Sequence, residues 1–272
     1  MTRQGALGRL GMGTWHMGDR AHAREREVAA LRLGLDLGIP LIDTAEMYGE
    51  GGAEEVVGAA IHGRRQGLRI VTKFYPHHAG RRELLAACDA SLARLGIERI
   101  DCYLYHWRGS VPLAETVPVL GELVRAGKIA SWGVSNFDVS DLEELVAIPG
   151  GGEVAMNQVL YNLEQRGIEF DLLPWCARHG VAVMAYSPLA EGRLAGHRAL
   201  ATIASRIDAT PAEVALAWTL RDANVISIPK AGAPEHVRAN RRAADLVLDP
   251  ETLAALDRAF PPPRRKTALA MI

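Results

Sequence analysis

Four side chains that could take part in acid–base chemistry follow one another along the first half of the chain. Asp43 and Tyr48 follow the apolar stretch PLI, Lys73 closes RIVTK, and His106 closes CYLYH. Tyrosine is a weak acid with an ordinary pKa of about 10, and a nearby ammonium group stabilises its phenolate and lowers that pKa. We therefore predict that Tyr48 donates a proton, that Lys73 lowers its pKa, and that Asp43 is the counter-ion of the lysine.

His106 adds a hydrogen-bond donor that could orient a carbonyl oxygen. Together the four groups would polarise a carbonyl and protonate the alkoxide formed from it. None of them is a reductant, so a hydride must come from a bound cofactor. Taken singly, each residue has an ordinary explanation, as a helix cap, a solvated lysine or a packed histidine. Their order at the ends of successive apolar stretches favours a shared site.

The apolar stretches that carry these groups have the length of strands and alternate with helical patterns. The expected strands are apolar at consecutive positions, which is typical of parallel strands covered on both faces; they span residues 10–14, 41–44, 69–74, 101–106, 129–135, 154–158, 181–186 and 225–229. The expected helices span residues 24–37, 53–65, 81–95, 113–126, 141–147, 169–178, 198–207, 212–221, 235–243 and 251–260. Ser140 with Glu143, and Thr210 with Glu213, have the spacing of a capping box and mark two helix starts.

This repeated strand-then-helix order predicts a parallel sheet with right-handed crossovers. Eight units predict an α/β fold of the closed (β/α)8 TIM barrel type, with extra helices near the C-terminus and residues 1–272 in a single domain. An open, doubly wound sheet is the alternative, but that fold usually carries a GxGxxG turn after its first strand. The glycines of LGRLGMGTWHMG lack this spacing.

The composition favours a small-molecule partner. Lys plus Arg number 31 and Asp plus Glu number 32, so there is no basic excess to attract nucleic acid or an anionic membrane. The three cysteines form no CxxC pair, which favours a reducing compartment. No signal peptide, membrane span or heptad pattern is found, so a cytoplasmic monomer is expected. The His77–His78 pair lacks partners at ligand spacing, so no metal site is expected.

Several segments resemble the aldo-keto reductase superfamily: LIDTAEMYGEGGAEEVVGAA, IVTKF, DCYLYHW, WGVSNF, NQVLYN, MAYSPLA and SIPKAGAPEHVRAN. The resemblance extends from GMGTW to the final helix. It implies a barrel that binds NAD(P)H in extended form across its mouth, and it implies the catalytic roles given above for Asp43, Tyr48, Lys73 and His106. The nearest likeness is to bacterial reductases of methylglyoxal and similar reactive aldehydes. Reduction of small aldehydes and ketones to alcohols is therefore the expected activity.

The resemblance also implies a set of cofactor contacts. For the nicotinamide, Ser135, Asn136 and Gln158 would bind the carboxamide and Tyr186 would stack on the ring. For the rest of the cofactor, the backbone at Ser187 and Leu189 would bind the pyrophosphate, Lys230 the 2′-phosphate, and His236 and Asn240 the adenine.

The choice between the two nicotinamide cofactors depends on Lys230 and His236. Lys230 favours NADPH, because a cation suits the 2′-phosphate. Many NADPH-dependent members have an arginine where this chain has His236, and a histidine is a weaker, pH-dependent phosphate partner. NADPH is therefore the expected cofactor, and NADH use stays open.

Trp15, Met47, His106 and Trp107 are expected to line the substrate pocket. Two tryptophans suit small or flat carbonyl compounds. The short segment after the last helix implies an open site, since long-tailed relatives use it to select bulky substrates. One alternative function stays open, a non-catalytic or slow cofactor-sensing barrel subunit that resembles potassium-channel beta subunits. A metal-dependent hydrolase or lyase is a weaker alternative, because it would need ligands at several strand ends.

Overall fold

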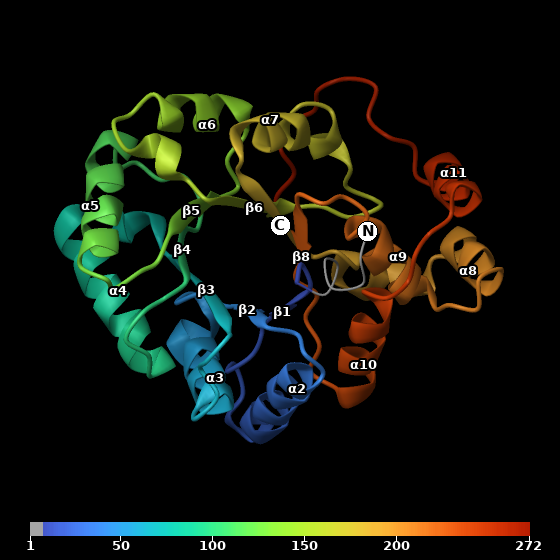
Figure 1. Ribbon diagram of the computed structural model, residues 1–272, viewed down its shortest axis with the longest axis horizontal. Coiled ribbons are helices and arrows are strands. Elements are labelled where there is room, and N and C mark those ends of the chain that lie inside the picture. The colour runs from blue at the N-terminus through green and yellow to red at the C-terminus, as the bar shows by residue number, and fades with distance from the viewer. Residues whose placement is uncertain (1–7) are drawn as a thin grey trace.

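The computed structural model describes residues 8–272, which form a barrel of eight parallel strands with helices around it (Figure 1). The strands are β1 (Gly11–Gly13), β2 (Leu41–Asp43), β3 (Arg69–Phe74), β4 (Cys102–Tyr105), β5 (Trp132–Ser135), β6 (Met156–Leu160), β7 (Ala182–Tyr186) and β8 (Val225–Ser227). Each strand pairs in parallel with the next one along the chain. Bridges from Leu10 to Ser227 and from Gly13 to Lys230 join β8 back to β1. The predicted (β/α)8 barrel is confirmed, and the open sheet is excluded.

The α-helices lie outside the strands, as Figure 1 shows. They are α2 (Arg24–Asp36), α3 (Gly52–Ile61), α4 (Arg81–Leu95), α5 (Leu113–Arg125), α6 (Val139–Val146), α7 (Leu172–His179), α8 (Arg198–Ser205), α9 (Pro211–Thr219), α10 (Pro234–Ala243) and α11 (Pro250–Ala259). Two of them, α8 and α9, lie between β7 and β8, and α11 follows α10 after the last strand. The extra helices expected near the C-terminus are therefore present.

The start of α6 differs from the prediction. The helix begins at Val139, two residues earlier than expected, and its capping box is formed by Asp138 and Asp141. The predicted pairing of Ser140 with Glu143 was wrong, because the aspartate two residues upstream supplies the cap. The other predicted capping box, at the start of α9, is confirmed.

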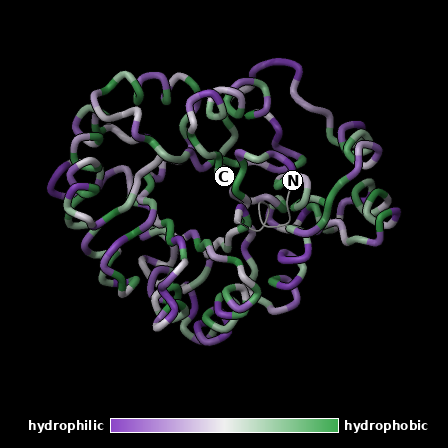
Figure 2. The backbone as a smooth tube through the Cα atoms, in the orientation of Figure 1, coloured by the Kyte–Doolittle hydropathy of each residue, from purple (hydrophilic) through white to green (hydrophobic). Residues whose placement is uncertain are grey.

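Two apolar clusters make up the core, one inside the barrel and one between the strands and the helices. The interior cluster consists of Leu41, Val71, Cys102, Leu104, Met156, Met184, Ile226 and Ile228. In Figure 2 the outer helices alternate between hydrophobic and hydrophilic residues, as expected when one face of each helix packs on the barrel. Strand β5 lies close to its neighbours at Gly133, where an added Cβ would be 2.4 Å from the carbonyl oxygen of Met156.

The segment 261–272, after α11, turns back towards the barrel, and its end lies over the strands in the projection of Figure 1. The Ile272 backbone lies beside the Tyr186 hydroxyl, where it partly offsets the rise in the pKa of that group caused by burial, so this end lies at the carboxyl end of β7. The short segment thus reaches the β7 side of the mouth, which the sequence did not predict.

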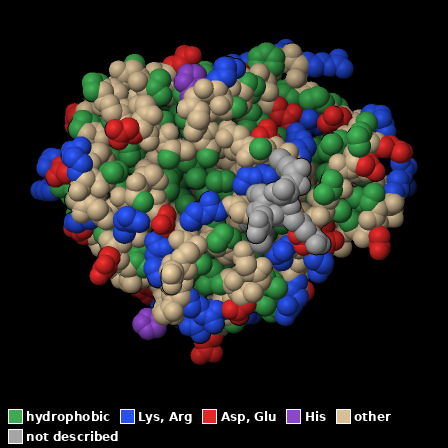
Figure 3. All heavy atoms as spheres, viewed as in Figure 1, with side chains coloured by type: hydrophobic (Ala, Val, Ile, Leu, Met, Phe, Trp, Pro, Cys, Tyr) green, Lys and Arg blue, Asp and Glu red, His purple; other side chains and the backbone are tan. Residues whose placement is uncertain are grey.

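Acidic and basic side chains are interspersed on the face shown in Figure 3. Within residues 8–272, no helix is long and apolar enough to cross a membrane.

Candidate active site

The inward-facing side chains of the barrel change from apolar to polar at the carboxyl ends of the strands. Asp43, Lys73 and Gln158 each come two positions after an apolar residue of the interior cluster. Because alternate residues of a strand face the same side, these three side chains continue the interior stack towards the mouth. All three are buried. The fold thus brings ionisable groups from β2 and β3 together with an amide from β6.

Lys73 has all three of its ammonium hydrogens in hydrogen bonds. Its Nζ donates to Asp43 Oδ2 at 2.9 Å, to the carbonyl oxygen of Thr44 at 2.8 Å and to the Tyr48 hydroxyl at 3.3 Å. The lysine side chain is 0% exposed. An ammonium group has three donors and no acceptor, so this residue is fully satisfied without a ligand. Its contact with Tyr48 is the predicted one.

Tyr48 begins a 3-10 helix, Tyr48–Gly51, directly after the β2 loop. Its hydroxyl oxygen accepts a hydrogen bond from Lys73, so its own hydrogen is free to point elsewhere. The His106 ring lies edge-on to the Tyr48 ring, with 5.8 Å between the ring centroids. His106 Nδ1 is buried and has no hydrogen-bond partner. These two side chains therefore lie together with capacity for a further polar partner.

The protonation states suit a site that donates protons at neutral pH. Burial opposes the charge of Lys73, but Asp43 and Tyr48 outweigh it and hold the pKa of the lysine above its usual value. Burial raises the pKa of Tyr48, and Lys73 only partly offsets this rise. The predicted lowering of the tyrosine pKa was therefore wrong as a net effect, because desolvation of the phenolate exceeds the attraction of the cation. Burial, together with the Lys73 charge, lowers the pKa of His106 to about 2, so the imidazole is neutral.

Asp43 is held from both sides. Oδ2 accepts from Lys73, and Oδ1 accepts from Gln158 Nε2 at 2.7 Å. A carboxylate can only accept, so the nitrogen of the Gln158 amide must face it and the amide oxygen must face away. That oxygen accepts no hydrogen bond within the described residues and is not a buried atom, so it is open to a ligand. Gln158 thus connects the charged group to the carboxyl end of β6.

A second set of hydrogen-bonded side chains is attached to the first through the backbone of Gln158. Ser135 Oγ donates to the carbonyl oxygen of Gln158, and Asn136 Nδ2 donates to Ser135 Oγ and to the carbonyl oxygen of His106. The Tyr186 hydroxyl donates to Asn136 Oδ1 at 3.0 Å. Asn136 has a φ of 60°, a left-handed conformation that asparagine tolerates better than most residues. The structure thus brings together the four residues expected to bind the nicotinamide.

The residues expected to bind the rest of the cofactor follow β7 and β8 but do not contact one another through hydrogen bonds. Ser187 has a left-handed backbone, and Leu189 immediately precedes a 3-10 helix, Ala190–Gly196. Lys230 and His236 are exposed, and within residues 8–272 their side chains form no hydrogen bond or ion pair. Asn240 lies buried on α10. That these residues bind the cofactor remains a proposal.

The residues expected to line the substrate pocket come from the loops that follow β1, β2 and β4. Trp15 is 37% exposed and stacks on His16. Trp107 contacts His106, with 4.8 Å between the ring centroids. Met47 directly precedes Tyr48 and is half-buried. The two tryptophans belong to the loops that follow β1 and β4.

A buried carboxylate that the sequence does not predict joins the loops beside these residues. Glu46 Oε1 accepts from the backbone N–H of Tyr75 at 2.6 Å and lies 2.8 Å from His78 Nδ1. The Tyr75 ring stacks on His77 and contacts Trp107 edge-on. Glu46 therefore ties the loop after β2 to the loop after β3. The spacing of His77 and His78 does not point to a glutamate 31 and 32 residues upstream, so the sequence does not predict this contact.

Comparison with known proteins adds a family to this geometry. The sequence profile of the Aldo/keto reductase family matches residues 9–260. Methylglyoxal reductase YeaE of Escherichia coli (strain K12) is 48% identical over 272 residues, covering 98% of this chain and 96% of that protein. A crystal structure of an aldo/keto reductase from Klebsiella pneumoniae in complex with NADP and acetate has a TM-score of 0.95 and 50% identity, covering 97% of this chain and 95% of the other. A second structure from that organism, in complex with NADPH, matches with the same values.

Proposed function

Since this chain belongs to the aldo/keto reductase family, we propose that it reduces small aldehydes and ketones to alcohols with NADPH and that Tyr48 is the proton donor. The observation that carries the proposal is the hydrogen bond from the buried Lys73 to the Tyr48 hydroxyl, beside a neutral His106. The similarity to methylglyoxal reductase YeaE supports reactive small aldehydes as the substrate class.

The proposed nicotinamide site has chemistry that suits a carboxamide. The Gln158 oxygen is an open acceptor, and Asn136 brings an amide group to the same place. A carboxamide has donors and an acceptor, so it can pair with both residues. Tyr186 offers an aromatic face that suits a flat ring. When bound, the reduced nicotinamide supplies the hydride that the protein itself lacks.

The protein's part in the reaction is to orient the carbonyl and to move one proton. His106 is neutral and can donate an N–H to the carbonyl oxygen. As negative charge develops on that oxygen, Tyr48 transfers its hydroxyl proton to it, and the product is an alcohol. Lys73 stabilises the phenolate that is left, and Asp43 keeps Lys73 charged. The phenolate then takes a proton from water to restore the starting state.

Lys230 supports NADPH over NADH as the cofactor. It is an exposed cation, without an ion pair in the described chain, three residues after β8. A free cation can meet a phosphate monoester, which NADH lacks. The exposed His236 on the next helix is a weaker phosphate partner, so we propose NADPH as preferred and NADH as the poorer substitute.

The test is a steady-state assay of the purified protein with methylglyoxal and with each nicotinamide, following the loss of absorbance of the reduced form. We expect turnover with NADPH to exceed turnover with NADH. Tight NADPH binding without turnover of any aldehyde or ketone would replace this proposal with the cofactor-sensing alternative.

We further propose that residues 1–272 act as one domain and that the protein is a cytoplasmic monomer. The cysteines Cys88, Cys102 and Cys176 are free thiols and buried, which suits a reducing compartment. Light scattering after size exclusion measures the mass directly, and a mass of twice 29.4 kDa would replace the monomer with a dimer.

A further inference from the structure

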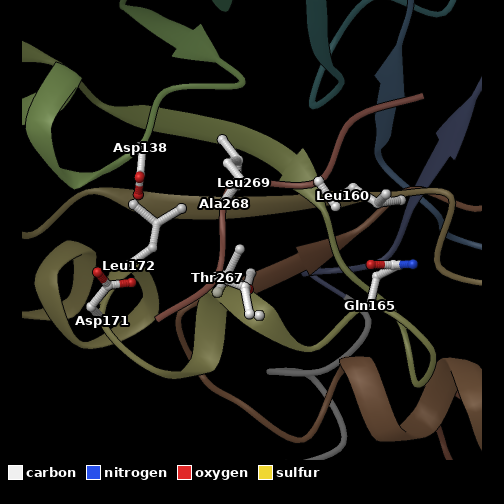
Figure 4. A pocket seen from close by; sticks show the side chains of 11 residues that line it. Asp138, Leu160, Gln165, Asp171, Leu172, Thr267, Ala268 and Leu269 are labelled. Carbon is white, nitrogen blue, oxygen red and sulfur yellow. The ribbon is translucent and has the colours of Figure 1, made fainter. Parts of the chain in front are cut away.

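The segment that follows α11 lies against the loop between β6 and α7. Leu269 packs on the main apolar cluster. Thr267 Oγ1 is so close to Gly167 that a Cβ added to the glycine would lie 2.6 Å from it. Figure 4 shows Thr267, Ala268 and Leu269 facing Leu160 and Leu172 across a cavity of about 240 Å³. Residues 267–270 therefore form one wall of a cavity beside the carboxyl end of β6.

Lys266 fixes the start of this wall by two ion pairs. Its Nζ lies 3.1 Å from Asp138 Oδ2 and 3.0 Å from Asp171 Oδ2. The two aspartates come directly before α6 and α7, where the helix dipole favours a negative charge. Asp138 is also held in place, because its Oδ1 accepts from the backbone N–H of Val139. The lysine thus meets two carboxylates whose positions are set by the fold.

The far end of the segment touches the proposed nicotinamide site. The backbone of Ile272 lies beside the hydroxyl of Tyr186, and that hydroxyl donates to Asn136. Between Lys266 and Ile272 the segment has no regular secondary structure. Within residues 261–272, Lys266 is the only side chain that forms an ion pair. Its two pairs are therefore the ionic attachment that keeps the segment in this position.

We propose that Lys266 is a positioning residue that limits the size of the substrate, because it tethers residues 267–272 along the β7 side of the mouth. This inference rests on the proposed function of the same mouth. The tether acts through the segment and not through the reacting atoms. A bulky aldehyde has to displace the segment, whereas a small one does not.

The ion pairs of Lys266 are suited to holding this segment in place and not to stabilising the whole protein. The Lys266 side chain is 45% exposed, and ion pairs in such positions contribute little to the stability of a whole protein. They are enough to shift the position of a segment that has few other attachments. We therefore expect its removal to free the segment while the barrel stays folded.

The experiment compares native protein with Lys266→Ala, Lys266→Arg and Asp171→Asn. Lys266→Arg keeps the positive charge for both ion pairs. Asp171→Asn removes one ion pair, and because the Asp171 side chain makes no capping hydrogen bond, α7 loses no cap. Lys128→Ala is the matched control, because Lys128 pairs with Asp89 in a similarly exposed ion pair that joins α4 to the turn after α5. Hydrogen exchange of peptides covering 267–272 reports the segment without any cofactor. The ratio of kcat/KM for phenylglyoxal to that for methylglyoxal reports the size limit.

For Lys266→Ala we expect segment exchange and the phenylglyoxal to methylglyoxal ratio each to rise about fivefold, the effect of two partly exposed ion pairs. Asp171→Asn should give a smaller rise, and Lys266→Arg and Lys128→Ala should match native protein. Unchanged exchange in Lys266→Ala would refute the tether. Faster exchange with an unchanged substrate ratio would refute the size limit. Native protein that turns over neither aldehyde would refute the proposed function, and exchange would still measure the tether.

Discussion

Replacing Lys73 with methionine separates the structural role of the buried ion pair from its role in proton transfer. Methionine keeps an unbranched side chain of similar length and removes the ammonium group. The carboxylate of Asp43, only 3% exposed, then keeps one hydrogen bond, from Gln158, and loses its counter-ion. Removing one partner of a buried pair typically costs about 3–5 kcal/mol, because it leaves an uncompensated charge. We expect the free energy of unfolding of Lys73→Met to fall by that amount at neutral pH.

The double variant Asp43→Asn with Lys73→Met removes both charges and should recover most of that stability. Asparagine keeps an oxygen that can accept from Gln158. Both variants should lose turnover by about 10²-fold or more, since the Tyr48 phenolate has lost its cation. A stable but inactive double variant would show that the charges are needed for chemistry and not for folding.

The pH dependence provides a further check. Burial already raises the pKa of Asp43 in the native protein, and the loss of Lys73 removes the largest opposing cause. A carboxyl group with a raised pKa in the folded state binds its proton more tightly there, so the folded state gains stability as pH falls. The loss in free energy of unfolding caused by Lys73→Met should therefore be smaller at pH 5 than at pH 8. Urea unfolding at both pH values measures it, and native-like stability of Lys73→Met at pH 8 would refute the buried-pair argument.

Three further outcomes can be checked by steady-state kinetics. Tyr48→Phe should bind NADPH nearly as the native protein does and lose about 10²–10⁴-fold in turnover, and near-normal aldehyde reduction would refute Tyr48 as the proton donor. Lys230→Ala should raise the KM for NADPH about tenfold, as expected when one charge-assisted hydrogen bond is lost, and should leave the KM for NADH unchanged. Equal effects on both KM values would show that Lys230 does not contact the 2′-phosphate. Because the pKa of His106 is lowered to about 2, this imidazole should stay neutral between about pH 5 and 8. The plot of kcat/KM against pH should therefore have the same shape at low pH for the native protein and for His106→Gln.

The barrel could be predicted from the sequence because its strands are short apolar stretches in a regular order. The ends of elements were harder to predict, because they depend on single residues. Strand β8 ends at Ser227, two residues before the predicted end, close to Pro229, which has no N–H for a sheet. Helix α7 begins at Leu172 rather than at 169, because Gly167–Glu169 forms a separate 3-10 helix first.

The candidate site was predicted in its membership and in the contacts of Lys73 with Asp43 and Tyr48, but not in its link to Gln158. Asp43, Tyr48, Lys73 and His106 each close or follow a strand, so the carboxyl-end rule was enough to group them. The bond between Gln158 and Asp43 joins residues 115 positions apart and depends on the register of β6 around the barrel, which local sequence does not give. The net direction of the Tyr48 pKa depends on its burial, and that is known only once the chain is folded.

The fold-back of residues 261–272 was not predicted for a similar reason. The ion pairs of Lys266 reach Asp138 and Asp171, which are separated from it by most of the second half of the chain. Neither aspartate is unusual in the sequence, since both stand where a helix cap is expected. Tertiary structure alone places them side by side.

The complete hydrogen bonding of Lys73 also explains why arginine could not replace it, although arginine would keep the positive charge. A guanidinium group carries five N–H donors in a rigid plane, and the space around Lys73 offers three acceptors and no contact with water. Two donors would be buried without partners, and the planar group would not fit the three directions that a tetrahedral ammonium satisfies. Shape and donor number, in addition to charge, therefore restrict this position to lysine.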